Sequence, residues 1–169
     1  VAFGFDAWMA QGGLRLPSPL IGTARALVDV DVGAALRPTL VGAWREAAEE
    51  RMVATFVWLE GSGTVPFDLP SASAVLDARR PMHIGVGGRT EKVLPACMTL
   101  AITLNDRLLA RFVPFSGWRE YRLPVPAGLL HPGRNALTVT AESDAGPARF
   151  AVTYVRVGDA RLHGGADEE

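Results

Sequence analysis

The sequence predicts an all-β domain in the form of an antiparallel β-sandwich. It contains 18 glycines and 12 prolines among 169 residues, and such frequent turn formers favour many short strands. Apolar residues recur at every second position, most clearly over 26–32 and 98–104, which is the period of a strand with one buried face. A single domain of this length buries roughly 70% of the surface that its unfolded chain exposes. One hydrophobic core is therefore expected.

The composition excludes several classes of protein. Hydrophobic residues make up 49% of the chain and charged residues 21%, which is ordinary for a globular domain and argues against disorder. The 17 basic and 18 acidic residues are spread without large blocks, so no nucleic-acid partner is expected. No apolar run approaches the roughly 20 residues that span a bilayer, so we expect no membrane insertion. Cys97 is the single cysteine, and we expect it to be a small buried filler.

The chain divides into three parts. Residues 1–24 have no regular period and are predicted to be an N-terminal arm that packs on the domain. Residues 25–160 are predicted to form the β-sandwich domain, and residues 161–169 a mobile tail. The chain begins with Val1 and shows no signal-peptide pattern, and we expect it to be part of a longer protein.

The first strands are predicted from alternation. Over 26–32, valines alternate with Asp29 and Asp31, which places the valines on a core face and the aspartates in water. Residues 53–69 are again rich in β-branched and aromatic residues, and Gly61-Ser62-Gly63 within them predicts a turn between two strands.

Residues 40–53 are ambiguous. Alanine, glutamate and arginine are good helix formers, and Trp44 and Met52 lie on a roughly helical stripe, so a short helix over 43–51 is one reading. The other is a strand that ends at Trp44 and is followed by a charged loop. The same uncertainty between strand and brief helix holds for 71–78.

The second half of the chain gives clearer signals. A hairpin is predicted where Asn105-Asp106 joins 98–104 to 107–113, because these two residues tolerate the left-handed backbone of a type I′ turn. In the next strand Arg119, Tyr121 and Leu123 share one face, and Glu120 and Arg122 share the other. Further strands are predicted over 83–86, 118–123, 136–141 and 149–157.

The segment Pro132-Gly133-Arg134-Asn135 predicts a tight corner before the strand 136–141. Proline fixes the backbone ahead of the turn, and Gly133 and Asn135 tolerate positive φ. Leu129 and Leu130 just before it are expected to cap the open end of the core. We interpret the whole corner as a determinant of the fold.

These elements resemble the galactose-binding-like β-sandwich, a jelly-roll fold that many carbohydrate-binding modules use. The resemblance covers roughly residues 40–157. It is carried by Leu104-Asn105-Asp106, Trp118 with Tyr121, Pro126 with Leu129-Leu130, Gly133-Arg134-Asn135 with Leu137, and more loosely by Gly42 to Glu46 with Phe56-Val57-Trp58. The resemblance implies a jelly-roll topology and a tendency to bind glycans, although some domains of this kind are spacers that bind nothing.

Sugar binding requires flat aromatic faces that stack on a pyranose and planar polar groups that bind its hydroxyls. Tryptophans beside charged residues near strand ends are the best candidates, whereas Trp58 lies in an apolar strand and is assigned to the core. For each polar candidate, a solvated surface charge is the alternative reading. The candidate sugar contacts are Trp44, Glu46, Asp106, Trp118, Arg119 and Tyr121, with Glu49 as a further polar group to test.

The sequence offers little support for a metal or for catalysis. Asp29 and Asp31 share one strand face and could contribute to a structural calcium site, but they lack a ligand-rich loop, so no cofactor is expected. The three histidines are not in a metal-ligand spacing. Ser116 lacks the Gly-X-Ser-X-Gly pattern of a hydrolase nucleophile. The glycine-rich segment 85–88 lacks the lysine of a phosphate-binding loop.

Two functions follow from these observations. The first is a non-catalytic module that binds carbohydrate or positions a glycan, within a larger glycan-active protein. The alternative is a structural or assembly domain that docks a neighbouring catalytic domain or partner without binding sugar. A small jelly-roll enzyme such as a lyase ranks third, and we expect no catalytic activity in this chain. The expected partner is carbohydrate or a neighbouring domain of the same polypeptide, and the compartment stays open, with an extracytoplasmic one favoured.

Overall fold

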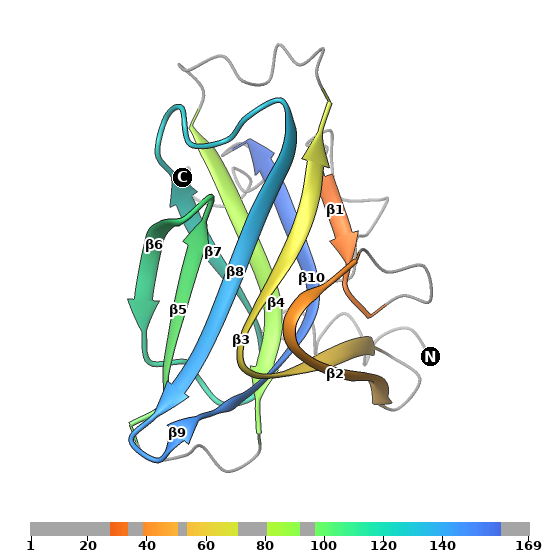
Figure 1. Cartoon of the computed structure of the whole chain (residues 1–169), viewed down its shortest axis with the longest axis vertical. Coiled ribbons are helices and arrows are strands. Elements are labelled where there is room, and N and C mark those ends of the chain that lie inside the picture. The colour runs from red at the N-terminus through yellow and green to blue at the C-terminus, as the bar shows by residue number, and fades with distance from the viewer. Residues whose placement is uncertain (1–27, 34–38, 51–53, 71–80, 92–96, 160–169) are drawn as a thin grey trace, which may run out of the picture.

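The computed structural model describes residues 28–33, 39–50, 54–70, 81–91 and 97–159, without the side chains of 46–50, Ala54 and Asp159. The predicted arm, the tail and the stretch 71–78 lie outside these residues. The described residues form strands, turns and loops without a helix, so the all-β prediction is confirmed (Figure 1). It follows that no helix in this part of the chain is long and apolar enough to span a bilayer.

Ten strands are present in the described residues, and all of their pairings are antiparallel. The sheet runs in the order β6-β5-β8-β3-β10-β4-β7, with β1 added to β10, β2 to β3 and β9 to β8. The strands are β1 (Val28–Asp31), β2 (Val41–Glu50), β3 (Ala54–Leu69), β4 (Met82–Thr90), β5 (Thr99–Leu104), β6 (Arg107–Phe112), β7 (Trp118–Val125), β8 (Gly133–Ser143), β9 (Gly146–Pro147) and β10 (Arg149–Asp159).

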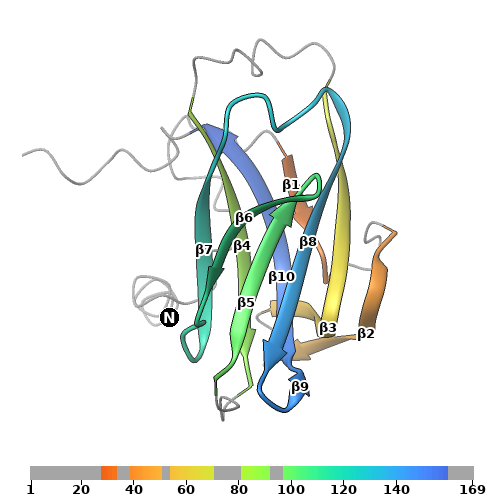
Figure 2. The ribbon, with the colours of Figure 1, turned by 60° about the vertical axis from the view of Figure 1, so that its left-hand side comes forward.

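The long strand β3 joins the two layers of the sandwich. Its first part, 57–60, pairs with β10, whereas 62–69 pair with β8. Gly61, with φ +89°, lies between these two parts. Figure 2 shows the result, with β6, β5 and β8 in front and β4, β10 and β1 behind. The predicted turn at 61–63 is therefore wrong, because the glycines allow one strand to bend from layer to layer instead of ending it.

The hydrophobic core lies between the layers. Both layers contribute alternate residues to it, as the pleat of a strand requires. The largest fully buried side chains are Phe150, Leu59, Ile84, Met98, Leu100, Ile102, Leu104 and Leu137, with Val32, Val57 and Val65. Val28 and Val30 of β1 pack against this core, which confirms the alternation that the sequence predicted.

Strand β2 resolves the ambiguous stretch. Val41–Glu50 is a strand that pairs with β3 at both of its ends and at Trp44, with register shifts on either side of Trp44. The helix over 43–51 is therefore wrong, and so is the loop after Trp44. Helix propensity amounts to less than about 1 kcal/mol per residue, and pairing with β3 outweighs it here.

The turns at the end of the sandwich follow the sequence closely. Asn105 and Asp106 have φ of 47° and 64°, as the predicted type I′ turn requires. Gly133 has φ +79°, and Leu130 is buried at the end of the core, as expected. Asn135 is not among the described residues with positive φ. Its role in the corner therefore comes from its side chain and not from its backbone conformation.

Cys97 differs from its prediction. It is exposed and has φ 54°, and its neighbour Met98 takes the core position instead. A hydrogen bond to the Asp144 carboxylate and the negative charge of that group raise the pKa of the Cys97 thiol. Because the thiolate is the nucleophilic form, a raised pKa lowers the fraction of reactive thiolate at neutral pH even though the thiol is exposed.

Candidate functional site

The predicted sugar contacts do not form one site. Trp44 packs on the core, and its indole N–H donates to the Val41 carbonyl at 3.0 Å. Asp106 is exposed in the turn between β5 and β6. The backbone of Glu46 lies in β2, and its side chain, like that of Glu49, is outside the described residues. The remaining three candidates, Trp118, Arg119 and Tyr121, lie on β7.

Strand β7 separates even these three residues. Tyr121 points into the sandwich, where its ring lies 4.9 Å from Phe112 and 6.1 Å from Phe150, measured between ring centroids. Trp118 contacts Tyr154 on the opposite face of β7. Since successive side chains of a strand point to opposite faces, Trp118 and Tyr121 cannot contact the same sugar ring from one face.

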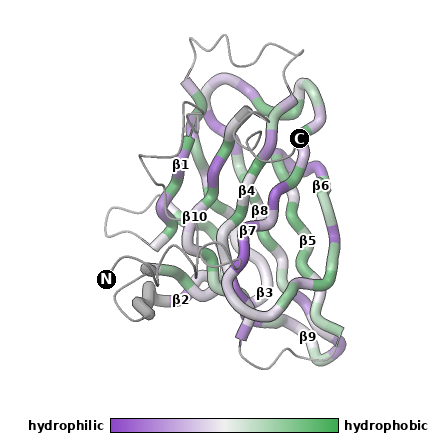
Figure 3. Tube along the Cα trace, turned by 180° about the vertical axis from the view of Figure 1, so that it is seen from behind, coloured by the Kyte–Doolittle hydropathy of each residue, from purple (hydrophilic) through white to green (hydrophobic). Residues whose placement is uncertain are grey.

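The side of β7 that carries Trp118 belongs to a continuous sheet surface, which we call the outer face (Figure 3). It is formed by residues of β7, β4, β10, β1 and the first part of β3, and the strand register places them in rows. One row is Trp118, Arg89, Ala151 and Trp58; the next is Glu120, Gly87, Tyr154 and Asp31; the third is Arg122, Gly85, Arg156 and Asp29.

Glycines of β4 form the floor of the outer face. A Cβ atom at Gly87 would lie 2.4 Å from the Tyr154 ring, and one at Gly85 would lie 3.3 Å from the Glu120 carboxylate. The segment 85–88 therefore serves close packing, because only glycine leaves room for large side chains to lie flat across the strand.

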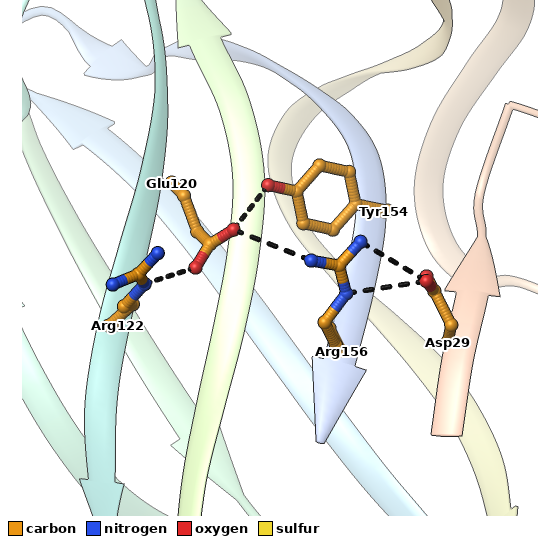
Figure 4. Close-up of polar contacts among 5 residues, drawn as sticks. All are labelled: Asp29, Glu120, Arg122, Tyr154 and Arg156. Carbon is orange, nitrogen blue, oxygen red and sulfur yellow. Dashed lines mark hydrogen bonds and ion pairs between the residues drawn. The ribbon is translucent and has the colours of Figure 1, made fainter. Parts of the chain in front are cut away.

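Glu120 is the centre of a polar network on this face (Figure 4). The Tyr154 hydroxyl donates to its Oε2 at 2.6 Å, and Arg122 Nε donates to its Oε1. Arg156 approaches Oε2 at 4.0 Å and reaches the Asp29 carboxylate at 3.1 Å with Nη2. Only 9% of the Glu120 side chain is exposed. The four charges alternate in sign, so each carboxylate is neutralised by a guanidinium.

The ionisation of this network follows from its contacts. Burial alone would raise the pKa of Glu120, but the hydrogen bonds from Tyr154 and Arg122 and the charges of Arg122 and Arg156 outweigh it, so the pKa is lowered. Burial, the charge of Glu120 and the hydrogen bond to it raise the pKa of Tyr154. At neutral pH the carboxylate therefore accepts and the phenol donates.

We expect Glu120→Gln to destabilise the protein by about 2 kcal/mol at neutral pH, because hydrogen bonds to a buried charge are lost. A carboxyl with a lowered folded-state pKa stabilises the fold above its unfolded pKa of about 4.3, and this stabilisation is lost as pH falls through the folded pKa. The difference in the free energy of unfolding between wild type and Glu120→Gln should therefore shrink in acid. Urea unfolding of both proteins at several pH values measures this difference.

Glu60→Gln is the matched control, since Glu60 pairs with Arg45 at the surface, where such pairs contribute less than about 1 kcal/mol. If the difference in the free energy of unfolding between wild type and Glu120→Gln stays constant with pH, the carboxylate is not the stabilising group.

An aromatic cluster adjoins the network. The Arg89 guanidinium lies 5.2 Å from the ring centroid of Trp118, 5.3 Å from that of Trp58 and 5.5 Å from that of Phe56. Arg149 lies over Trp58 at 4.7 Å. Phe56 is buried, whereas both tryptophans are only half-buried, so the assignment of Trp58 to the core is wrong: the core residues of this part of β3 are its neighbours Val57 and Leu59.

The structure gives no support to a calcium site at Asp29 and Asp31. The Asp29 carboxylate pairs with Arg156, and Asp31 accepts a hydrogen bond from the Gly33 N–H at 3.0 Å. Within the described ranges, no group of three or more histidine, cysteine, aspartate or glutamate side chains is placed to hold a metal ion.

No protein family and no curated protein matches the sequence, but solved structures match the fold. A domain named CBM36-1, of a multidomain xylanase from the hindgut metagenome of Trinervitermes trinervoides, has a TM-score of 0.51 at 15% identity, over 79% of this chain and 97% of that one. A CBM61 domain in complex with β-1,4-galactotriose has a TM-score of 0.51 at 13% identity, over 80% and 99%.

A third similar structure is the CBM22-1 xylan-binding domain from Paenibacillus barcinonensis, with a TM-score of 0.50 at 10% identity, over 81% of this chain and 96% of that one. At such low identities the likeness concerns the fold. The chain therefore has the β-sandwich fold of carbohydrate-binding modules, as the sequence led us to expect.

Proposed function

We propose that this chain is a non-catalytic carbohydrate-binding module and that it holds a glycan on the outer face, beside Trp118 and Trp58. The fold it shares with carbohydrate-binding modules supports the proposal. Fold alone does not determine function, so the proposal depends on the side chains of this face.

One observation carries the proposal: two partly exposed tryptophans lie beside a compact set of guanidinium and carboxylate groups. An indole presents a flat apolar surface to the C–H groups of a pyranose, and the polar groups beside it can bind hydroxyls. The arginines hold the tryptophans in place through cation–π contacts. An oligosaccharide would therefore meet rigid partners, which lowers the entropic cost of binding.

We propose a neutral glycan as the ligand and no metal at the site. In the Glu120 network the carboxylates of Glu120 and Asp29 are each paired with a guanidinium. A uronic acid would have to compete with these carboxylates for the arginines, and a cation would have to compete with the arginines for the carboxylates. Hydroxyl groups need do neither, because a guanidinium has five N–H donors and can give another of them to a hydroxyl while it stays paired with its carboxylate.

We expect Trp118→Ala to weaken binding about tenfold or more, since an aromatic contact is worth roughly 1 kcal/mol beyond the area it buries. Calorimetry with xylan, β-1,4-galactan and β-1,4-mannan measures the effect. Trp44→Phe is the matched control, because Trp44 packs on the core from β2. If the folded wild-type protein binds none of these glycans, or if Trp118→Ala binds equally well, the proposal is wrong.

A structural role is the second candidate, because some large apolar side chains are exposed. Val41 is 58% exposed, Leu108 55%, Val113 66% and Phe115 59%. They come from β2, from β6 and from the segment after β6, and scattered exposed apolar residues are normal on a protein surface. Carbohydrate binding is therefore the function that the geometry supports better.

A further inference from the structure

Phe115 is an exposed aromatic residue outside the outer face. It lies in the segment that joins β6 to β7, and 59% of it is exposed to solvent. Exposure of one apolar side chain is common and by itself indicates nothing. What distinguishes Phe115 is that its ring and its backbone are both held in place.

The backbone of Phe115 is fixed from inside the sandwich by the Tyr121 hydroxyl, which accepts a hydrogen bond from the Phe115 N–H at 3.2 Å and is 3.5 Å from the Phe115 carbonyl oxygen. The Tyr121 ring itself is packed against Phe112 and Phe150. Buried Pro114 precedes Phe115, and Gly117, with φ +84°, ends the segment. The loop tip is therefore anchored to the core.

The ring of Phe115 is held by Arg119, whose guanidinium lies 4.1 Å from the ring centroid. Arg119 is also exposed. A phenyl ring beside a planar donor is the same combination that Trp118 and Arg89 form on the outer face, and it suits the same chemistry: stacking on a sugar ring with hydrogen bonds to its hydroxyls.

Phe115 also lies close to the outer face along the chain. It precedes Trp118 by three residues, so their Cα atoms are at most about 11 Å apart. Trp118 is the first residue of β7, the last strand in the sheet order, and Phe115 lies in the segment just before it. A glycan chain that lies beside Trp118 can therefore continue around this sheet edge to Phe115.

We propose that Phe115 and Arg119 form a second sugar-binding subsite and that Tyr121 is its positioning residue. This inference rests on the proposed function, and it gives that function a direction: the bound glycan extends from Trp118 across the beginning of β7 to Phe115. It also reassigns Tyr121, which the sequence suggested as a direct sugar contact. The tyrosine acts by presenting Phe115.

The test is the dependence of affinity on ligand length. Trisaccharides and hexasaccharides of xylose, of galactose and of mannose, all β-1,4-linked, are titrated into the protein by calorimetry. We expect the wild type to bind the hexasaccharide of its preferred sugar about tenfold more tightly than the trisaccharide. Phe115→Ala should remove most of this advantage and leave trisaccharide affinity unchanged, whereas Trp118→Ala should weaken both ligands.

Two further variants separate positioning from stacking. Tyr121→Phe keeps the packed ring and removes the hydroxyl, so it should lower hexasaccharide affinity about threefold with a less favourable binding entropy. Phe115→Trp keeps an aromatic ring at this position and should preserve the tighter binding of the longer ligand. Val113→Ala, in the same segment and 66% exposed, is the control and should change nothing.

If Phe115→Ala keeps the full preference for the longer ligand while Trp118→Ala weakens both, the second subsite is wrong and the proposed function stands. If the wild type binds no oligosaccharide and no polysaccharide, both proposals fail.

Discussion

Replacing Asn135 by alanine is expected to lower the free energy of unfolding by about 4 kcal/mol. Asn135 is 1% exposed. Its Oδ1 accepts from the His131 N–H at 3.0 Å and from Asn105 Nδ2 at 2.9 Å, and its Nδ2 donates to the carbonyls of His131 and Gly133. Alanine leaves several of these groups without partners, and each costs about 1–3 kcal/mol when buried. Urea unfolding followed by tryptophan fluorescence gives the value.

Asn135→Asp tests whether the donor half of the amide matters. A carboxylate can still accept from His131 and Asn105, but it cannot donate to the two carbonyls and it places a charge in the interior. We therefore expect a loss at least as large as for alanine at neutral pH, and a smaller one in acid, where the carboxyl is protonated. Arg134→Ala, at the exposed neighbouring position, should change stability by less than about 0.5 kcal/mol. A small effect of both Asn135 variants would mean that water or a rearranged turn satisfies the corner.

The sequence predicts the strands of this domain well where a strand and its turn are encoded locally. The hairpin of β5 and β6 was found from alternation and from Asn105-Asp106, and the valines of β1 from their period of two. Both signals involve only neighbouring residues, so they need no knowledge of the partner strand. The corner before β8 was found in the same way from Gly133.

The failures concern elements whose conformation depends on distant residues. Strand β2 contains good helix formers, and only its pairing with β3 makes it a strand. Strand β3 continues through 61–63 because its two parts pair with different strands, the first with β10 and the second with β8. Asn135 was predicted for its backbone freedom, whereas its amide in fact joins the corner to Asn105, 30 residues away. Short-range patterns contain none of this information.

The candidate site was found only in part for the same reason. Trp118 was selected for its charged neighbours and does lie on the proposed binding face. The alternation along β7 places Tyr121 on the face opposite to Trp118, so this local pattern is enough to separate the two candidates. Arg89, Tyr154 and Arg156 reach the site through strand register, which the sequence does not reveal. One local signal did exist: glycines in the middle of a strand indicate that something large packs across them.

The second large effect is expected from these glycines: Gly88→Ala should destabilise the protein by about 3 kcal/mol. A Cβ atom there would lie 2.4 Å from the Ala151 carbonyl oxygen and 2.6 Å from the Phe150 ring. Phe150 is fully buried in the core, and the carbonyl belongs to the neighbouring strand β10, so neither can move without breaking packing or pairing. Overpacking of a rigid core costs about 1–3 kcal/mol, occasionally more. Thermal and urea unfolding measure the loss.

Gly87→Ala is the informative comparison, because the adjacent glycine faces the opposite side of β4. Its Cβ would lie 2.4 Å from the far edge of the Tyr154 ring, and this side chain can swing away if it gives up its hydrogen bond to Glu120. We therefore expect a stability loss of about 2 kcal/mol, close to that of a lost hydrogen bond to a charged group, together with weaker glycan binding. Gly88→Ala should instead lower stability and leave the affinity of the folded fraction unchanged. Equal stability losses at the two positions would contradict this division, in which one face of β4 serves the core and the other serves the site.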